Sequence, residues 1–245
     1  MTFKVVLLLA LLLSCFAFFV PESMVLPRAV YDHLNLFIPM DLRCDDDFLE
    51  KCQLDFNKKL NLLNPEILNW RNAPGLVLQI QNKMTLTPGF LLEGYLEVCE
   101  ARTEFFQSMT SMWDACISRS HLLSQLNSTE DTSVTFPFTY VQMWKHLEFI
   151  CNAGSVVVFN TKNFKTLLDL PRLDAYKACE ASFLENLDKD PTNLCPSTQT
   201  FMDCANKAFD EWSDHEMTDG WFACEEIRVG YADFCPHLRC YVLQQ

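Results

Sequence analysis

Apolar residues recur at every fourth position in several segments of the chain. In residues 45–63, Phe48, Cys52, Phe56 and Leu60 follow one another at this spacing. Because an α-helix has 3.6 residues per turn, such side chains share one helix face. The spacing returns in residues 87–106, 139–154, 174–187 and 197–212, and less regularly in residues 219–231. The pattern predicts six amphipathic helices.

Residues at the ends of these segments support the prediction. An aspartate of the run 45–47 can cap the first helix, and Asp174 can cap another. Thr87 is a candidate N-cap with Pro88 at the first helical position, and Gly154 is placed to end a helix. We therefore expect the acidic run to serve helix capping.

Four further segments are less regular. Residues 64–70 are predicted to form a short helix, whereas 75–81 and 155–160 are either short strands or helix ends. Residues 127–138 are polar and then β-prone, which favours a loop between two possible halves of the molecule. This loop holds a glycosylation sequon at Asn127.

The N-terminus predicts export. Lys4 precedes an apolar run from Val5 to Val20, which is interrupted only by Ser14 and is typical of a signal peptide over residues 1–17. An uncleaved anchor is the alternative, but the run is shorter than the ~20 residues of a spanning helix. We expect no membrane span after signal removal, an irregular arm over 18–43, and a cysteine-rich helical domain over 44–245.

In an exported protein, the number of cysteines indicates how many disulfides can form. The chain has 12, and removal of Cys15 with the signal leaves 12 − 1 = 11. In an oxidising compartment these favour disulfides, and the odd number leaves one thiol that is free, buried or available for a covalent dimer. The disulfide candidates are Cys44, Cys52, Cys99, Cys116, Cys151, Cys179, Cys195, Cys204, Cys224, Cys235 and Cys240.

The pairing itself stays open, with one exclusion. Cys44 and Cys52 cannot pair across a helix, because eight residues at the helical rise separate them by about 12 Å, beyond the ~7 Å that a disulfide tolerates. Several cysteines lie on the apolar stripes, which predicts bonds between neighbouring helices; buried thiols are the alternative. These stripe cysteines are Cys52, Cys99, Cys151, Cys179, Cys204 and Cys224.

The composition disfavours certain classes of fold and of partner. The formal charge is −13, which argues against nucleic-acid binding, and only 6 glycines are present, which favours helices over a turn-rich β fold. We predict an all-α, disulfide-stapled bundle of about six or seven helices with little or no β structure.

No motif assigns a catalytic residue, a cofactor or a metal. His215 begins a sequence like a zinc-protease motif, but Asp219 stands where its second histidine should be. His237 lies between Cys235 and Cys240 without a second cysteine pair nearby, so disulfide bonding is the favoured role of these cysteines. Three successive aspartates at a helix start diverge by about 100° each and do not surround an ion.

One aromatic cluster is richer than a single helix face requires. Phe105, Phe106, Met109, Met112 and Trp113 lie close together in sequence. They predict either the wall of an apolar ligand pocket or interface, or a second buried face, and the buried face is the favoured interpretation.

The cysteine series also resembles a known group of proteins. The segments "CDDDFLEKCQLDFNKKLNL" and "LEVCEARTEFFQSMTSMWDAC" are similar to secreted cysteine-rich helical proteins of nematodes. Among these, they most resemble the domain of chondroitin proteoglycan core proteins, or a similar worm domain of unknown function. The resemblance spans roughly Cys44 to Cys240 and implies an extracellular, non-enzymatic helical module. The chain lacks a Ser-Gly dipeptide, the usual glycosaminoglycan acceptor, which weighs against a matrix-proteoglycan role.

Together these patterns predict a secreted, non-enzymatic binding or structural module. Its expected partner is an extracellular protein or a matrix component. A carrier of small hydrophobic molecules is the first alternative, and a secreted hydrolase is the second.

Overall fold

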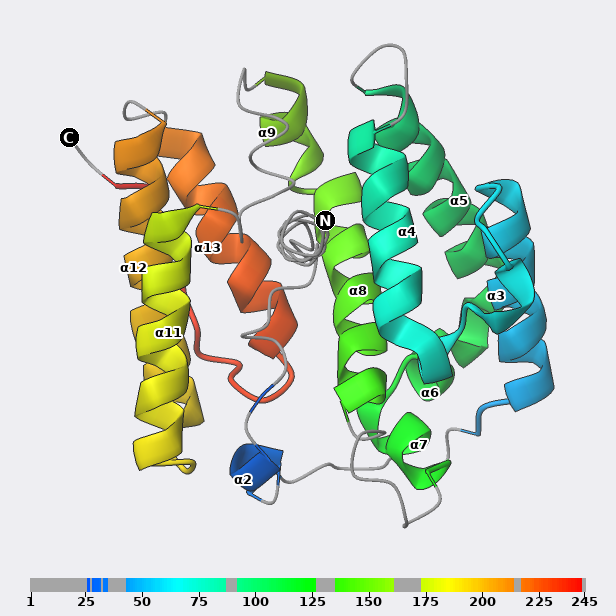
Figure 1. Ribbon diagram of the computed structural model, residues 1–245, viewed down its shortest axis with the longest axis horizontal. Helices are drawn as coiled ribbons and strands as arrows, with labels where there is room; N and C mark the ends of the chain where they lie inside the picture. Colours follow the sequence, from blue (N-terminus) through cyan, green and yellow to red (C-terminus); the bar gives the residue numbers. More distant parts are fainter. Residues whose placement is uncertain are drawn as a thin grey trace, which may run out of the picture.

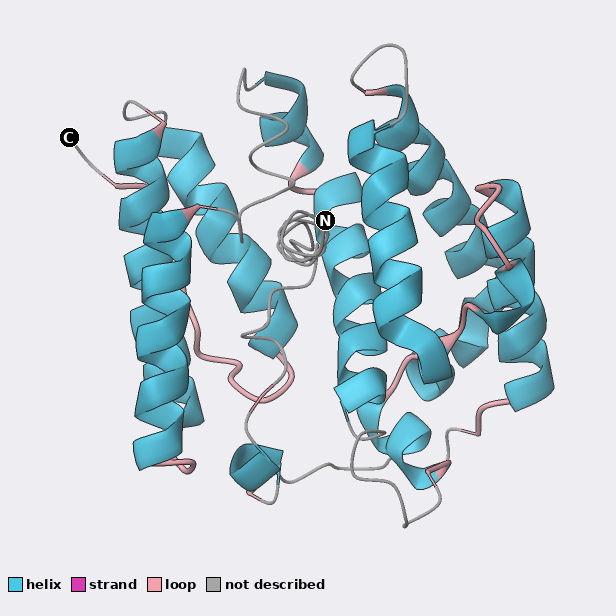
Figure 2. Cartoon of the chain, viewed as in Figure 1, coloured by secondary structure: helices cyan, strands magenta, loops and turns pink. Residues whose placement is uncertain are grey.

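The computed structural model describes residues 26, 28–31, 33–34, 43–86, 92–126, 135–160, 173–213 and 217–243. Within these ranges the regular structure is helical and contains no strand (Figures 1 and 2). The longer helices are α3 (Asp46–Lys59), α4 (Ala73–Leu86), α5 (Glu93–Met109), α8 (Thr135–Cys151), α11 (Asp174–Lys189), α12 (Leu194–Trp212) and α13 (Met217–Tyr231). The shorter ones are α2 (Arg28–Tyr31), α6 (Trp113–Cys116), α7 (Arg119–Ser124), α9 (Ser155–Asn160), and the 3-10 helices η2 (Pro65–Ile67), η3 (Trp70–Asn72) and η4 (Thr110–Met112).

The predicted fold class is confirmed. The protein is an all-α bundle held by disulfides, and the longer helices of the described part, from 14 to 19 residues, correspond to the predicted number. None of the helices in the described ranges is both long enough and apolar enough to cross a membrane.

The acidic run starts α3 as predicted. Asp45 is the N-cap, and its side chain accepts a hydrogen bond of 3.1 Å from the backbone N–H of Phe48. Asp46 and Asp47 follow in the first turn, where the positive end of the helix dipole favours them. The capping interpretation therefore accounts for all three aspartates.

The two segments that the sequence left open are both helical. Residues 75–81 belong to α4, and residues 155–160 form α9. Leu76, Val77 and Ile80 are fully buried, because α4 packs against α5 and α8. The segment 64–70 forms η2 and the first residue of η3, not one continuous helix.

The helices form two groups. In Figure 1, α3, α4, α5 and α8 lie on one side and α11, α12 and α13 on the other, and α8 packs against α13 between them. The division therefore falls after α8 and before α11, and the short helix α9 contacts both α8 and α13. This differs from the predicted joint at 127–138, because residues 135–138 already belong to α8 and residues 127–134 lie outside the described part.

Each disulfide of the described part lies within one group. Cys44–Cys116 and Cys99–Cys151 tie the first group together. The second group contains Cys179–Cys204, Cys195–Cys235 and Cys224–Cys240. Side-chain packing between the groups is continuous, since one cluster of buried apolar residues extends from Leu26 to Leu238. Noncovalent contacts, above all those of α8 with α13, therefore hold the two groups together.

The prediction that Cys52 forms a disulfide was wrong. Cys52 is the free cysteine of the described part, and only 6% of its surface is exposed. Burial and the nearby Asp55 raise the pKa of its thiol, so the reactive thiolate is disfavoured. Cys52 is therefore a buried thiol, the alternative to a disulfide that the sequence left open. Because its sulfur is buried, it is poorly placed to bond a second copy of the chain.

Close approach of α13 to its neighbours depends on two glycines. A Cβ at Gly220 would lie 2.6 Å from the backbone oxygen of Asn206 on α12. A Cβ at Gly230 would lie 1.9 Å from Gln142 Nε2 on α8. Any larger residue would force these helices apart or displace their side chains.

Candidate functional site

A groove with a volume of about 1020 Å³ lies where the two helix groups meet. Its walls come from α5, α6, α7, the end of α8, and the last turns of α13 with the turn that follows. Charged and aromatic side chains both line these walls. The charged lining residues are Arg102, Asp114, Arg119, Lys145, Glu148, Glu225, Arg228 and Asp233, and the aromatic ones are Phe106, Trp113, Phe149 and Phe234.

Asp233 joins the two groups at one end of the groove. Its Oδ2 accepts a hydrogen bond of 2.7 Å from Arg119 Nη1 and forms an ion pair with Lys145. Burial alone would raise the pKa of Asp233, but Lys145 and Arg119 outweigh it and the pKa is lowered. The pKa of Lys145 is lowered by burial and then by Arg119, despite Asp233. The carboxylate is thus held ionised by two cations, Arg119 on α7 and Lys145 on α8.

Arg119 itself is almost fully enclosed. Its side chain is 5% exposed, and Nη2 donates to Gln142 Oε1 at 3.1 Å and to the Gly230 backbone oxygen at 3.0 Å. The guanidinium also lies over the ring of Phe234, at 4.9 Å from its centroid. Arg119 therefore donates hydrogen bonds to both helix groups and links them.

Arg102 is in a different position. Its side chain is 7% exposed and lies over Phe106 and Trp113, with its Cζ 5.0 and 5.7 Å from the ring centroids. Its nearest carboxylate is Glu148, with Nη2 and Oε1 3.7 Å apart, which is beyond hydrogen-bond distance. Burial lowers the pKa of Arg102, and Glu148 only partly opposes this effect. Arg102 is a buried cation with weak compensation.

The predicted aromatic cluster is divided between the core and the groove. Phe105 and Met109 are buried, and Phe105 stacks on Trp144 with ring centroids 4.1 Å apart. Phe106, which is 39% exposed, and Trp113 line the groove, and their centroids are 5.0 Å apart. The favoured interpretation, a second buried face, describes the first pair, whereas the pocket-wall interpretation describes the second.

Met112, the remaining member of that cluster, is half-buried against the core at the end of η4. It is not among the lining residues of the groove. The patch suggested by the sequence is therefore not one continuous surface.

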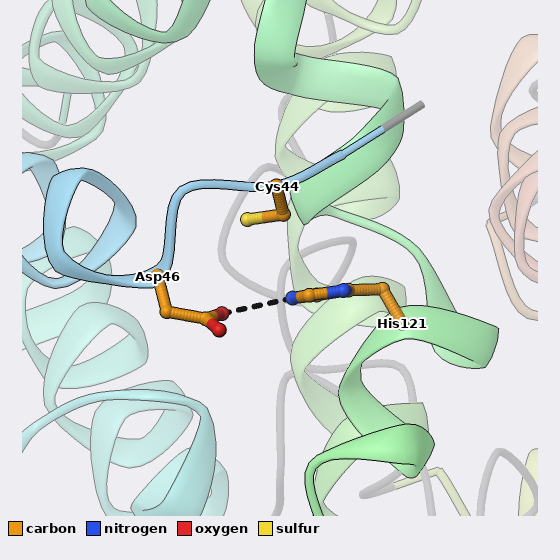
Figure 3. A group of neighbouring side chains, drawn as sticks. All are labelled: Cys44, Asp46 and His121. Carbon is orange, nitrogen blue, oxygen red and sulfur yellow. Dashed lines mark hydrogen bonds and ion pairs between the residues drawn. The ribbon is translucent and has the colours of Figure 1, made fainter. Parts of the chain in front are cut away.

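A small group of possible metal ligands lies elsewhere, at the start of α3. Cys44, Asp46 and His121 place one sulfur, one carboxylate and one imidazole close together (Figure 3). The sulfur of Cys44 is bonded to Cys116, so it is not available as a thiolate ligand. His121 Nε2 lies 2.8 Å from Asp46 Oδ1. This contact links α7 to the first turn of α3, and it leaves two donors, too few for a built metal site.

The segment around His237 is also structural. The disulfide role that the sequence favoured for its two cysteines is confirmed, and the structure supplies the pairing, Cys235 with Cys195 and Cys240 with Cys224. Asn127, the predicted glycosylation site, and residues 1–17, the predicted signal peptide, lie outside the described residues. So do Thr87 and Pro88, the predicted start of the second helix.

Sequence patterns did not identify the charged residues of the groove. Arg102, Lys145 and Glu148 lie on two helices that are distant in sequence, and no local motif joins them. A partial signal was available, because Arg102 stands four residues before Phe106 and therefore shares a helix face with it.

The buried pair behind the groove was missed as well. His146 Nδ1 on α8 lies 3.2 Å from Glu226 Oε1 on α13, and both side chains are buried. Burial raises the pKa of Glu226, and the nearby His146 opposes the rise. Neither residue belongs to the groove lining, so we place this pair in the junction between the groups.

Comparison of the chain with protein-family models, curated proteins and solved structures yielded no match.

Proposed function

We propose that the protein is a secreted, non-enzymatic extracellular module that binds a partner in the groove between its two helix groups. The observation that carries the proposal is the groove itself, which combines aromatic and charged side chains on a frame of disulfide-bonded helices. Interfaces that bind proteins or amphipathic molecules use this combination, with aromatic residues and arginine enriched.

The disulfides support the proposed extracellular location. Such bonds persist in oxidising surroundings and are rare in the cytosol. The apolar run in residues 5–20 supports export by the secretory route. The resemblance to secreted nematode modules agrees with this proposal and remains a prediction.

A binding role is supported over a hydrolytic one by the character of the lining. Among the described residues that line the groove there is no histidine. His146 faces Glu226 inside the junction, and His121 faces Asp46. Two carboxylates of the groove are instead engaged with cations, Asp233 with Arg119 and Glu225 with Arg228.

A carrier of small hydrophobic molecules is the second candidate. Phe106 and Trp113 favour it, because both rings face the groove. The buried positions of Phe105 and Met109 reduce the apolar surface that the cluster offers to a ligand.

The test compares two matched variants of the secreted protein. Ala153→Arg adds a long cation at an exposed position of the groove wall, and Ala181→Arg adds one at an exposed position of α11, outside the groove lining. Each protein is immobilised and exposed to extracellular fluid from the source tissue, and retained components are quantified by mass spectrometry. Organic extracts of the purified proteins are analysed in parallel for apolar molecules.

We expect a component that wild type and Ala181→Arg retain equally and that Ala153→Arg loses at least about tenfold. If that component is an apolar molecule in the extract, the carrier function replaces the partner-binding one. If no retained component distinguishes the two variants, or if the protein is not exported, the proposal is wrong.

A further inference from the structure

The guanidinium of Arg102 lacks acceptors. Within the described part of the chain it makes no hydrogen bond, and its Nε is buried without a partner. A buried arginine carries five N–H donors, and donors that are removed from water without an acceptor are costly. Buried polar groups in native proteins are nearly always satisfied, so this side chain points to a missing acceptor.

Glu148 does not supply that acceptor. Its Oε1 remains 3.7 Å from Nη2, and its side chain is 54% exposed at the edge of the groove. Arg119 differs in its Nη atoms, which donate to Asp233, Gln142 and Gly230 in the same groove. The two side chains are buried to a similar extent, so the difference between them lies in the acceptors of their Nη atoms.

The surroundings of Arg102 define the shape of the missing group. The rings of Phe106 and Trp113 lie against the guanidinium, and both line the groove beside it. Phe149 adds a third ring to the lining. An oxyanion attached to a flat apolar body would pair with the guanidinium and place its body against these rings.

We propose that Arg102 anchors a subsite for an organic carboxylate with a flat apolar body. The carboxylate displaces Glu148 from the vicinity of Nη2 and accepts hydrogen bonds from the guanidinium, and the apolar body contacts Phe106 and Trp113. The subsite deepens the proposed binding function, since it names the chemistry that the groove recognises.

The test uses two probes that differ in charge but hardly in shape, 2-naphthoate and 2-naphthamide. Binding to the full-length secreted protein is measured by calorimetry and by quenching of tryptophan fluorescence. For wild type we expect the carboxylate to bind about tenfold more tightly than the amide, because charge-assisted hydrogen bonds to the guanidinium form only with the carboxylate.

Three variants locate this preference. Arg102→Gln should remove the preference and leave binding of the amide within about twofold. Arg71→Gln is the matched control, because Arg71 lies over Trp70 and pairs with Glu50 but is half-exposed and outside the groove; it should change neither affinity. Glu148→Gln removes the competing carboxylate and should strengthen binding of naphthoate by about threefold, without an effect on the amide.

Equal binding of the two probes by wild type overturns the proposal, and so does a preference that survives in Arg102→Gln. If Arg102→Gln does not fold, Glu148→Gln decides, because unchanged or weaker binding of naphthoate then contradicts the displacement of Glu148. Failure of this subsite is distinguishable from failure of the proposed function: a groove-dependent partner that Ala153→Arg loses can persist without any preference for naphthoate. In that case the groove binds by other contacts.

Discussion

Removal of the Cys99–Cys151 bond should destabilise the protein strongly. The bond ties α5 to the last residue of α8 and closes a loop with a sequence separation of 52. The chain-entropy relation for a loop of this length gives about 4 kcal/mol of stabilisation. Natural domains are stable by ~5–15 kcal/mol, so the double variant Cys99→Ala/Cys151→Ala should lose a large share of its free energy of unfolding.

Equilibrium unfolding in urea measures this loss, and thermal unfolding provides a second reading. For a chain of this size, a loss of about 4 kcal/mol corresponds to a decrease in Tm of roughly 8–16 °C. The matched control is Cys52→Ala, which removes a buried sulfur but no bond. It should cost on the order of 1 kcal/mol, the typical effect of a single substitution.

Loop length provides an internal check. The Cys224–Cys240 bond has a sequence separation of only 16, and the same relation gives about 3 kcal/mol. If the free energy of unfolding of Cys99→Ala/Cys151→Ala lies within about 1 kcal/mol of that of wild type, the cross-link does not stabilise the protein as expected. An equal loss of unfolding free energy in Cys52→Ala would also contradict a stabilising cross-link, because the loss would then come from cysteine packing.

Two further substitutions test the junction around α13. Gly220→Ala should lower the free energy of unfolding by about 1–3 kcal/mol in urea, because its Cβ would meet the Asn206 backbone oxygen at 2.6 Å; a neutral or stabilised variant would show that α12 and α13 can separate without cost. Glu226→Gln should gain Tm relative to wild type as the pH rises from 4 to 8. Burial raises the folded-state pKa of Glu226 above the unfolded value of about 4.3, so its contribution to stability is present at low pH and is lost as the pH rises through the folded-state pKa. A difference in Tm that is constant with pH, or that reverses, would show that ionised Glu226 is fully stabilised by His146.

The helices were predictable where one face is polar. α3 is an example, since Phe56 is buried and its neighbours Asp55 and Lys58 are exposed, so the four-residue stripe is visible in the sequence. In α4, Leu76 and Ile80 are surrounded by other helices, and the apolar run that results carries little periodic signal. Because α4 is buried on several sides, its sequence shows little of the polar face by which an amphipathic helix is recognised.

The candidate site was predictable only in part. Cys52 and Cys99 both lie on apolar stripes, but a disulfide requires a second cysteine within reach on another helix, which is a property of the tertiary structure. The aromatic side of the groove was visible in Phe106 and Trp113. The weak pairing of Arg102 with Glu148 was not, because it arises from the packing of α5 beside α8.

The most direct test of an exported, disulfide-bonded module is peptide mapping of the protein recovered from the medium of secreting cells, without reduction and with free thiols blocked. We expect Cys52 to be labelled only after unfolding, and within the described part we expect the five bonds Cys44–Cys116, Cys99–Cys151, Cys179–Cys204, Cys195–Cys235 and Cys224–Cys240. A bond that joins the two helix groups, a bonded Cys52, or a fully reduced chain would contradict this expectation.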